Sequence, residues 1–268
     1  MIRKIYNQII AGKDCYQTNT PNVKKNFLAG ICLYMNVVRI VLYTSKQAKK
    51  GIYGDSEWIS SSLDMLHSFE KCGMYFEISG MDNLRKVKGP VIFVSNHMST
   101  LETLILPGII HPIHRVVFVM KEELVKFPFF GRVSAARDPI LVKRENPRED
   151  LITVLEQGAK KIQEGKSVII FPQKTRTKYF EEKSFNTLGI KLAKKNNIPV
   201  IPIALLTDAW ENGKIIKEFG KIDTSKKVRF CFGEPITDLS NTSLAHLGII
   251  NFIKNKLIEW GKQNLIIN

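Results

Sequence analysis

The sequence predicts an α/β protein whose central sheet is mostly parallel, with helices on both faces and a helical segment before it. From residue 75 onward, short runs rich in β-branched and aromatic residues alternate with amphipathic stretches. Strands that alternate with helices build parallel sheets that are covered on both sides. Hydrophobic residues make up 44% and charged residues 24% of the 268 residues, and this composition excludes wholesale disorder.

The first 75 residues read as helical, and Gly51, Gly54 and Asp55 separate one helix from the next. The second helix is expected over residues 56–71, because apolar side chains recur there at helical intervals. We therefore expect an N-terminal helical segment over residues 1–74 and an α/β domain over residues 75–268. No internal repeat or low-complexity linker divides the chain further.

Within the α/β part, strands are predicted wherever a short apolar run is bounded by turn residues. These runs are 75–78, 91–95, 116–120, 140–143, 167–171, 200–205 and 228–232. Helices are predicted over 148–164, 185–197 and 243–263. The helix 148–164 has acidic residues in its first turn, lysines near its end and Gly165 as a stop signal, which suits the helix dipole.

The chain carries 40 Lys and Arg against 25 Asp and Glu, a formal net charge of +15. This excess favours an anionic partner, which could be nucleic acid, a membrane surface or a phosphorylated ligand. The most apolar window, residues 27–43, is interrupted by Asn36 and Arg39, and an arginine at the centre of a bilayer costs about 2.5 kcal/mol or more. Lysines flank the window at both ends: Lys24, Lys25, Lys46, Lys49 and Lys50.

This pattern predicts a helix that lies in the interface of an anionic membrane, with a buried helix of a soluble protein as the alternative. Residues 1–74 are then a membrane-associating segment, and we expect the protein on the cytoplasmic face of a membrane. The first residues show no signal-peptide pattern. The cysteines are far apart, which argues against a disulfide framework and a zinc site (Cys15, Cys32, Cys72 and Cys231). We expect no metal site.

The strongest chemical signal follows the run 91–95, where Asn96 and His97 come next and Glu102 stands five positions after the histidine. Residues five apart on an ideal helix are about 140° apart and do not face each other. His97 and Glu102 can meet only at a junction of strand and helix, with His97 before the first turn. There the positive helix end would keep His97 neutral, as a general base requires, and Glu102 would fix its tautomer. The alternative is a histidine with a structural hydrogen bond.

Basic and hydroxyl side chains follow two other strands. Lys143 and Arg144 end the run 140–143, and the sequence Phe171-Pro172-Gln173-Lys174-Thr175-Arg176-Thr177 follows the run 167–171. Cations and hydroxyls at the carboxyl end of a strand form an anion cradle in the place where open α/β sheets bind ligands. A solvated basic loop is the alternative.

A fourth pattern is the apolar run 198–203, whose Pro199 and Pro202 are unusual in a central strand and indicate an edge or a ligand wall. Together, these blocks resemble the glycerolipid acyltransferase family, the 1-acyl-glycerol-3-phosphate acyltransferases and their relatives. That family shows N-H-x4-D, a strand that ends in Arg, F-P-E-G-T-R-S and a hydrophobic block with paired prolines, in this order. The resemblance covers residues 89–206, and the N-terminus is similar to the family's membrane-docking helices.

The resemblance implies that a fatty acyl group moves from acyl-CoA or acyl-carrier protein to the hydroxyl of a lysophospholipid, with 1-acyl-glycerol 3-phosphate as the expected acceptor. His97 would take the hydroxyl proton, and Glu102 would stand in the place of the family's Asp. The acceptor's phosphate would be held by Lys143, Arg144, Lys174, Thr175 and Arg176, and Asn96, Ser99 and Gln173 are further site residues. No cofactor is implied, and the expected partners are an anionic membrane, the lysophospholipid and the acyl donor.

The chain departs from the family's pattern at several of these positions. Glu102 replaces Asp, Gln173 replaces Glu and Lys174 replaces Gly. These exchanges add a methylene, remove a negative charge and place a side chain where the backbone needs freedom. The stretch 134–139 also lacks the glycine that the family has ahead of its Arg-ending strand.

Two other functions remain as alternatives. The chain could be a non-catalytic or altered-acceptor relative that binds lipid, or a basic protein that binds nucleic acid. Nucleic-acid binding requires a continuous basic stripe with interleaved aromatic residues, whereas the cations described above fall at strand ends beside His97. We therefore expect no nucleic-acid partner.

Overall fold

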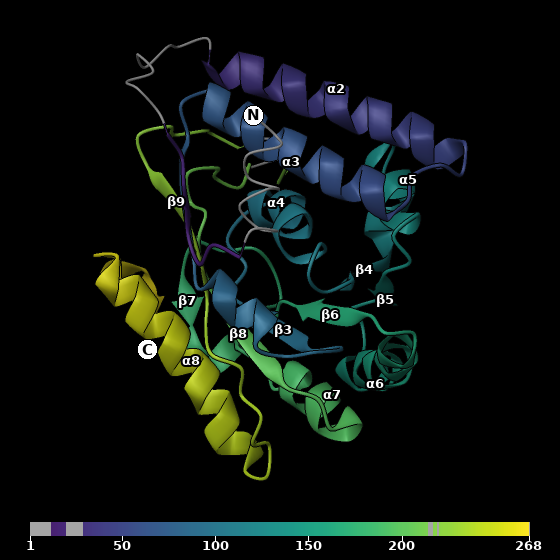
Figure 1. Ribbon diagram of the computed structural model, residues 1–268, viewed down its shortest axis with the longest axis vertical. Coiled ribbons are helices and arrows are strands. Elements are labelled where there is room, and N and C mark those ends of the chain that lie inside the picture. Colours follow the sequence, from purple (N-terminus) through teal and green to yellow (C-terminus); the bar gives the residue numbers. More distant parts are fainter. Residues whose placement is uncertain (1–11, 20–28, 214–216, 219, 268) are drawn as a thin grey trace.

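The computed structural model describes residues 12–19, 29–213, 217–218 and 220–267 (Figure 1). Of the predicted N-terminal helical stretch, residues 1–11 and 20–28 lie outside this part. The rest contains two long helices, α2 (Ala29–Lys49) and α3 (Asp55–Lys71). Helix α3 coincides with the predicted helix, and Gly54 precedes it as its N-cap residue.

The prediction of helix throughout the first 75 residues is wrong at strand β1 (Tyr16–Gln17). This strand pairs antiparallel with β2 (Tyr75–Ser79), where Tyr16 lies opposite Ile78. The hydroxyl groups of Tyr16 and Thr18 both donate to the buried carboxylate of Glu70, at 2.5 and 2.7 Å. These long-range hydrogen bonds stabilise an extended conformation that local periodicity does not encode.

The main sheet has eight strands in the order β1-β2-β9-β8-β3-β6-β4-β5, and every pair except β1–β2 and β8–β9 is parallel. The predicted mostly parallel α/β sheet is thus confirmed. The remaining strands of the sheet are β3 (Ile92–Ser95), β4 (Val116–Lys121), β5 (Ile140–Val142), β6 (Ser167–Ile170), β8 (Val200–Leu206) and β9 (Lys227–Phe232). Strands β7 (Phe180–Glu181) and β10 (Ile266–Ile267) form a small second sheet.

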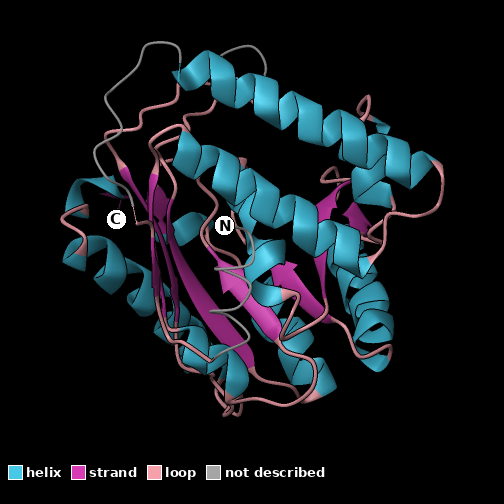
Figure 2. Ribbon diagram, turned by 45° about the horizontal axis from the view of Figure 1, so that its top comes forward, coloured by secondary structure: helices cyan, strands magenta, loops and turns pink. Residues whose placement is uncertain are grey.

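Helices cover both faces of the sheet, as predicted (Figures 1 and 2). One layer contains α2, α3 and α4 (Leu101–Ile110), and the other contains α6 (Pro147–Gln163), α7 (Leu188–Asn196) and α8 (Thr242–Glu259). A short helix, α5 (Phe130–Ala135), lies near α2. Single 3₁₀ turns connect other elements: Met81–Arg85, Glu122–Lys126, Glu182–Ser184 and Gln263–Leu265.

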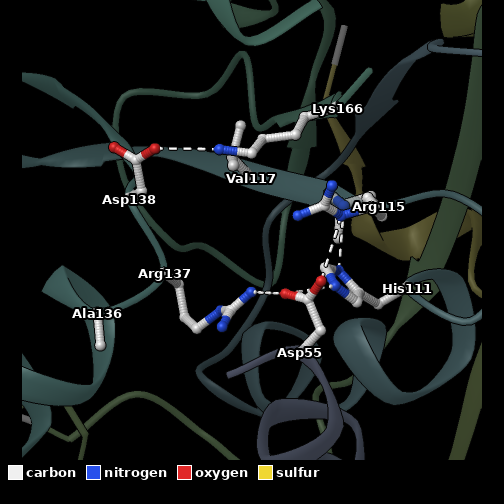
Figure 3. Close-up of a pocket in the computed structure, with 9 residues that line it drawn as sticks. Asp55, His111, Arg115, Val117, Ala136, Arg137, Asp138 and Lys166 are labelled. Atoms are coloured by element: carbon white, nitrogen blue, oxygen red, sulfur yellow. Dashed lines mark hydrogen bonds and ion pairs between the residues drawn. The ribbon is translucent and has the colours of Figure 1, made fainter. Parts of the chain in front are cut away.

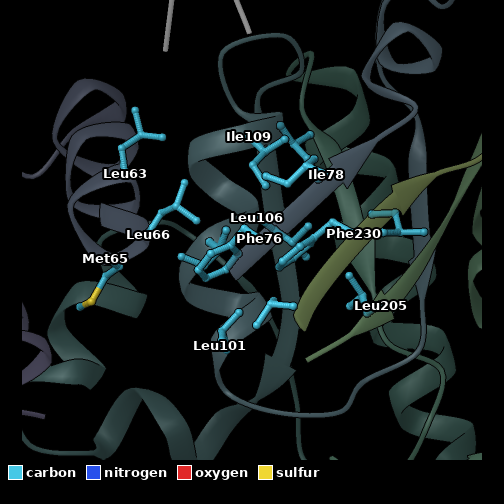
Figure 4. Close-up of a cluster of buried hydrophobic side chains, with 14 of the residues drawn as sticks. Leu63, Met65, Leu66, Phe76, Ile78, Leu101, Leu106, Ile109, Leu205 and Phe230 are labelled. Carbon is cyan, nitrogen blue, oxygen red and sulfur yellow. The ribbon is translucent and has the colours of Figure 1, made fainter. Parts of the chain in front are cut away.

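Successive side chains of the strands point to opposite faces of the sheet and contribute to two hydrophobic clusters, one on each face. In β3, Phe93 joins the cluster under α2, α3 and α4, whereas Ile92 and Val94 join the cluster under α6, α7 and α8. Figure 4 shows part of the first cluster, where Leu66 of α3 and Leu106 of α4 lie over the sheet. The two N-terminal helices therefore share one core with the sheet.

The prediction that the proline-containing run 198–203 forms an edge is wrong, because β8 lies between β9 and β3. The main-chain nitrogen of Val200 donates to Ile236 on the β9 side, and residue 202, two positions on, directs its nitrogen to the same side. The β8–β9 ladder is irregular there: the carbonyl of Pro202 accepts from the N–H of Gly233 at 2.8 Å, but regular pairing resumes only at Ile203 opposite Phe232. The missing N–H of Pro202 thus falls at a gap in the ladder.

Candidate active site

The predicted site residues lie at the carboxyl ends of three strands of the main sheet, β3, β6 and β5. His97 follows β3, the run 171–177 follows β6, and Lys143 and Arg144 follow β5. Strands β3 and β6 are direct neighbours, while β4 separates β6 from β5. This edge is where ligands bind in open parallel sheets, so the topology brings the blocks from the sequence to one side of the molecule.

His97 and Glu102 are in contact across the junction of β3 and α4. Nδ1 of His97 lies 2.9 Å from Oε1 of Glu102. His97 precedes α4, while Glu102 is in its first turn, which is the arrangement that the five-residue spacing required. Because Nδ1 faces the carboxylate, Nε2 is the ring nitrogen left for a substrate, and it makes no hydrogen bond to the described residues.

The carboxylate of Glu102 is fully buried and accepts hydrogen bonds on both oxygens. Oε1 accepts from the main-chain N–H groups of Met98 and Ser99, at 2.7 and 2.8 Å, in addition to its contact with His97. Oε2 accepts from the hydroxyl groups of Ser99 and Thr207, at 2.7 and 2.6 Å. The extra methylene of Glu102 relative to Asp is thus accommodated by a complete set of donors.

The two pKa values of the pair are shifted in the directions that a neutral base needs. Burial lowers the pKa of His97, and the positive charges of Arg176 and Arg144 lower it further, against the opposing effect of Glu102. Burial raises the pKa of Glu102, but the hydrogen bonds from His97, Thr207 and Ser99 outweigh it and hold that pKa below its ordinary value. At neutral pH the pair is therefore a neutral imidazole beside a carboxylate.

His97 is held in place from the β6 side as well. Its main-chain N–H donates to Oε1 of Gln173 at 2.7 Å, and its carbonyl accepts from the N–H of Thr177 at 2.9 Å. Its ring stacks on Phe171, with 4.1 Å between the ring centres. Gln173 is buried and accepts through its amide oxygen, so the loss of the family's glutamate charge leaves this hydrogen bond in place.

Asn96 and Ser99 connect the junction to strand β8. The side-chain amide of Asn96 donates to the carbonyl of Leu205, and its oxygen accepts from the N–H of the same residue, both at 2.9 Å. This reciprocal pair extends the β3–β8 contact beyond the last regular pair, Ser95 with Ile203. Oγ of Ser99 lies 3.1 Å from the hydroxyl of Thr207, which follows β8. Asn96 thus anchors the chain directly before His97 to β8, and Ser99 holds the Glu102 carboxylate.

Arg176 lies directly beside the histidine turn. Its Nη1 donates to the hydroxyl of Thr100, which precedes α4, and its Nη2 donates to Oε1 of Glu218 at 2.5 Å. The neighbouring Thr175 accepts a hydrogen bond from Nζ of Lys217 at 2.6 Å. The structure thus brings Arg176 together with the His97–Glu102 pair, and its guanidinium is engaged by a carboxylate.

Arg144 reaches the same loop from β5, since its Nη1 donates to the carbonyl of Lys174. Arg144 has a φ of 62°, in the left-handed region. The carboxylate of Asp150, in the first turn of α6, accepts from the main-chain N–H groups of Lys143 and Arg144, at 3.0 and 2.9 Å, and fixes this turn. The side chains of Lys143 and Lys174 are exposed.

The chain lacks a glycine at two places where the family has one, at Lys174 and in the stretch 134–139, and the backbone differs between them. Lys174 is not among the described residues with positive φ, so its side chain brings no left-handed strain. In the glycine-free stretch 134–139, Asp138 has a φ of 50°. Asp tolerates this conformation better than most residues with a Cβ atom, which allows the turn before β5 to form without glycine.

Three residues of the site were missed by sequence reasoning: Thr207, Asn212 and Glu218. Thr207 binds Glu102, Asn212 donates to the carbonyl of Met98 at 2.8 Å, and Glu218 binds Arg176. All three follow β8 and lie far from their partners in the chain. A local motif could not have revealed them, although the position of Thr207 directly after a predicted strand was an available signal.

A cavity of about 130 Å³ lies away from His97, at the amino ends of the strands (Figure 3). Arg115 and Lys166, which line it, precede β4 and β6. Arg115 and Arg137 both bind Asp55 of α3, and Lys166 binds Asp138 at 3.1 Å. The ion pairs of Asp55 connect α3 to the segments that precede β4 and β5, and we assign the cavity no ligand.

Among the described residues, no group of three or more His, Cys, Asp or Glu side chains could hold a metal ion. In the same part of the chain, no helix is long and apolar enough to cross a bilayer.

Comparison with known proteins places these residues in context. The Acyltransferase family model matches residues 75–206. A 1-acyl-sn-glycerol-3-phosphate acyltransferase of Pseudomonas aeruginosa is 35% identical over 132 residues, which cover 49% of this chain and 49% of that protein. A probable 1-acyl-sn-glycerol-3-phosphate acyltransferase of Mycoplasma genitalium is 26% identical over 174 residues, covering 63% of this chain and 64% of that protein. The matched part thus spans about half to two thirds of the length of these relatives.

Among solved structures, the chain is similar to the crystal structure of the 1-acyl-sn-glycerophosphate acyltransferase PlsC of Thermotoga maritima. The TM-score is 0.64 at 18% identity, and the match covers 88% of this chain and 96% of that one. At this identity the likeness establishes the fold alone. It agrees with the mostly parallel α/β sheet described above.

Proposed function

We propose that the protein transfers a fatty acyl group from a thioester donor to the hydroxyl of a lysophospholipid, because residues 75–206 match the Acyltransferase family model. The names of its relatives favour 1-acyl-glycerol 3-phosphate as the acceptor. The observation that carries the proposal is the neutral His97, bound through Nδ1 to a buried carboxylate and flanked by Arg176.

In the proposed reaction, Nε2 of His97 accepts the proton of the acceptor's hydroxyl while the oxygen attacks the thioester carbonyl. Glu102 holds the ring in the required tautomer and stabilises the imidazolium that forms. The tetrahedral intermediate then collapses, the carbon–sulfur bond breaks, and the leaving thiolate takes the proton from His97. The acyl group never becomes bound to the protein, so the reaction needs no nucleophilic serine or cysteine.

The basic side chains around His97 suit an acceptor that carries a phosphate. Arg176 and Arg144 are close enough for their charges to lower the pKa of His97, and both converge on the loop that contains Lys174 and Thr175. Guanidinium groups bind phosphate through paired hydrogen bonds. We therefore keep Lys143, Arg144, Lys174, Thr175 and Arg176 as the proposed phosphate-binding set.

The test is a thiol-release assay with purified protein, acyl-CoA or acyl-carrier protein as the donor, and a series of lysophospholipids. His97→Ala should lower kcat by about 10²–10⁴-fold, because a positioned general base contributes that much. His246→Ala, on α8 away from the site, is the control and should leave the rate unchanged. Full activity of His97→Ala would contradict the role of His97.

We also propose that the protein binds an anionic membrane surface through α2. The exposed side chains of Ile31, Met35, Val38 and Leu42 recur at helical spacing and form one apolar stripe along this helix. Lys46 and Lys49 lie in its last turn and are exposed. An exposed apolar stripe with cations at its end suits the interface of a bilayer with anionic headgroups, whose lipids would also supply the acceptor.

A further inference from the structure

Arg176 has no open access to an incoming phosphate in the free protein. Its side chain is only 14% exposed, because Thr100 engages Nη1 and Glu218 engages Nη2. A guanidinium this far from water needs an anionic or polar partner, since an unpaired charge in such a position is costly. Glu218 supplies that partner while no substrate is bound.

The residues around Glu218 hold it over the site through contacts with separate parts of the fold. Lys217 donates to Thr175, in the same loop as Arg176. Asn212 donates to the carbonyl of Met98, next to His97. The hydroxyl of Tyr34, on α2, donates to the carbonyl of Gly220. Glu218 is therefore placed by a network of contacts, in addition to its own bond to Arg176.

An acceptor phosphate that binds Arg176 meets Glu218 as a competitor. Two anions bonded to one guanidinium lie within a few ångströms of each other and repel strongly in a site with little water. The phosphate must either displace the carboxylate or bind against its charge. Both cases give the same result, which is that Glu218 weakens the binding of every acceptor whose phosphate uses Arg176.

We propose that Glu218 occupies the place of the acceptor's phosphate in the free protein and sets the affinity for phosphate-bearing acceptors. This inference rests on the proposed function of Arg176. A thioester donor that does not use Arg176 is unaffected by Glu218. The carboxylate thus keeps Arg176 paired and oriented until a stronger anion replaces it.

Glu218→Gln in the full chain tests this inference, because the amide keeps the shape and removes the charge. The KM for 1-acyl-glycerol 3-phosphate should fall about tenfold, which corresponds to about 1.4 kcal/mol, while the KM for the acyl donor stays constant. The matched control is Glu211→Gln, a carboxylate in the same loop that faces Lys226 instead of Arg176. An acceptor KM that is unchanged or raised in Glu218→Gln would overturn the inference.

A double-mutant cycle shows whether Glu218 acts through Arg176. In an Arg176→Ala background, Glu218→Gln should no longer lower the acceptor KM; a persistent effect would overturn the inference. Calorimetric titration with glycerol 3-phosphate gives a readout that needs no turnover, and Glu218→Gln should bind it more tightly than the natural chain. If no acceptor is acylated at all, the proposed function fails, and this titration alone decides the role of Glu218.

Discussion

Whether His97 can act as a base depends on which of two effects controls its pKa. Burial and the nearby arginines lower the pKa of His97, while the Glu102 carboxylate raises it, and the net shift is downward from 6.5. The base is active when it is neutral, so activity is present above this lowered pKa and is lost as the pH falls through it. We therefore expect the acid limb of kcat/KM to have an apparent pKa below 6.5.

This pH profile is measured most clearly with an acceptor whose phosphate has been methylated. A phosphate monoester itself titrates near pH 6, with a second pKa of about 6, and would add its own limb to the curve. The methyl ester keeps one negative charge throughout this range. An acid limb above pH 6.5 with this acceptor would mean that Glu102 dominates and that His97 is charged in the free protein.

At the scale of single residues, the contact between His97 and Glu102 could be predicted because it follows from local geometry. The spacing of His97 and Glu102 allows them to meet only where a strand passes into a helix, and the structure has that junction. The hydrogen bond from Thr207 to Glu102 joins residues that are 105 positions apart. Such a contact depends on the order of strands in the sheet, which no local pattern contains.

At the scale of elements, helix α4 depends on a side chain of α3. Pro107 lies inside α4, and the N–H of the next residue, Gly108, donates to Oγ of Ser62 at 2.8 Å. The same hydroxyl donates to the carbonyl of Leu104 at 2.6 Å. Ser62 thus links the N–H of Gly108 to the carbonyl of Leu104, in the turn of α4 that contains the proline.

Replacing Ser62 with Ala should destabilise the protein by about 1–3 kcal/mol, because it removes the hydroxyl that binds the buried N–H of Gly108 and the part-buried carbonyl of Leu104. Equilibrium unfolding in urea measures this loss. Ser60→Ala is the matched control, since Ser60 is an exposed serine on the same helix. Equal stability of the two variants would contradict the bridging role of Ser62.

The elements that sequence periodicity predicted correctly are those whose burial follows a regular pattern. The predicted strand 167–171 became β6, and the predicted helix 148–164 became α6. Strand β8 shows the limit of such reasoning. Pro202 argued for an edge, but the interrupted β8–β9 ladder accepts a proline in the middle of the sheet, and that interruption is a tertiary feature.

At the scale of the whole molecule, the proposed membrane surface predicts a difference between two exposed apolar side chains. Met35 on α2 is 68% exposed and Leu244 on α8 is 67% exposed, on opposite sides of the sheet. Met35→Asp should reduce binding to vesicles of anionic phospholipid by roughly tenfold or more, because burial of such a side chain contributes about 1.5–3 kcal/mol. Leu244→Asp should have no effect.

Co-sedimentation with vesicles measures both variants under the same conditions. Binding of the natural chain should also weaken as salt rises, since Lys46 and Lys49 would contact charged headgroups. Equal loss of binding in Met35→Asp and Leu244→Asp would contradict α2 as the docking surface. Substitutions are more informative here than removal of the helix, because Leu33 and Ile40 of α2 belong to the hydrophobic core.

At this scale, the sequence predicted the type of sheet but not the order of its strands. Alternating strands and helices predicted the parallel sheet, but the place of β9 between β2 and β8, and its antiparallel pairing with β8, follow from long connections that have no sequence signature. The candidate site was nevertheless predictable in outline, because the carboxyl ends of parallel strands face one edge in any order.

The position of β9 shows that the residues matched by the family model are fewer than the residues that build the main sheet. The family match ends at residue 206, whereas β9 begins at Lys227 and is hydrogen-bonded to both β2 and β8. A fragment cut at the borders of the match would leave β2 without either of its partner strands and β8 with an open edge. It would also expose the hydrophobic face of the sheet on which Phe69 of α3 packs. The main sheet therefore needs strands on both sides of the matched residues, β1 before them and β9 after them.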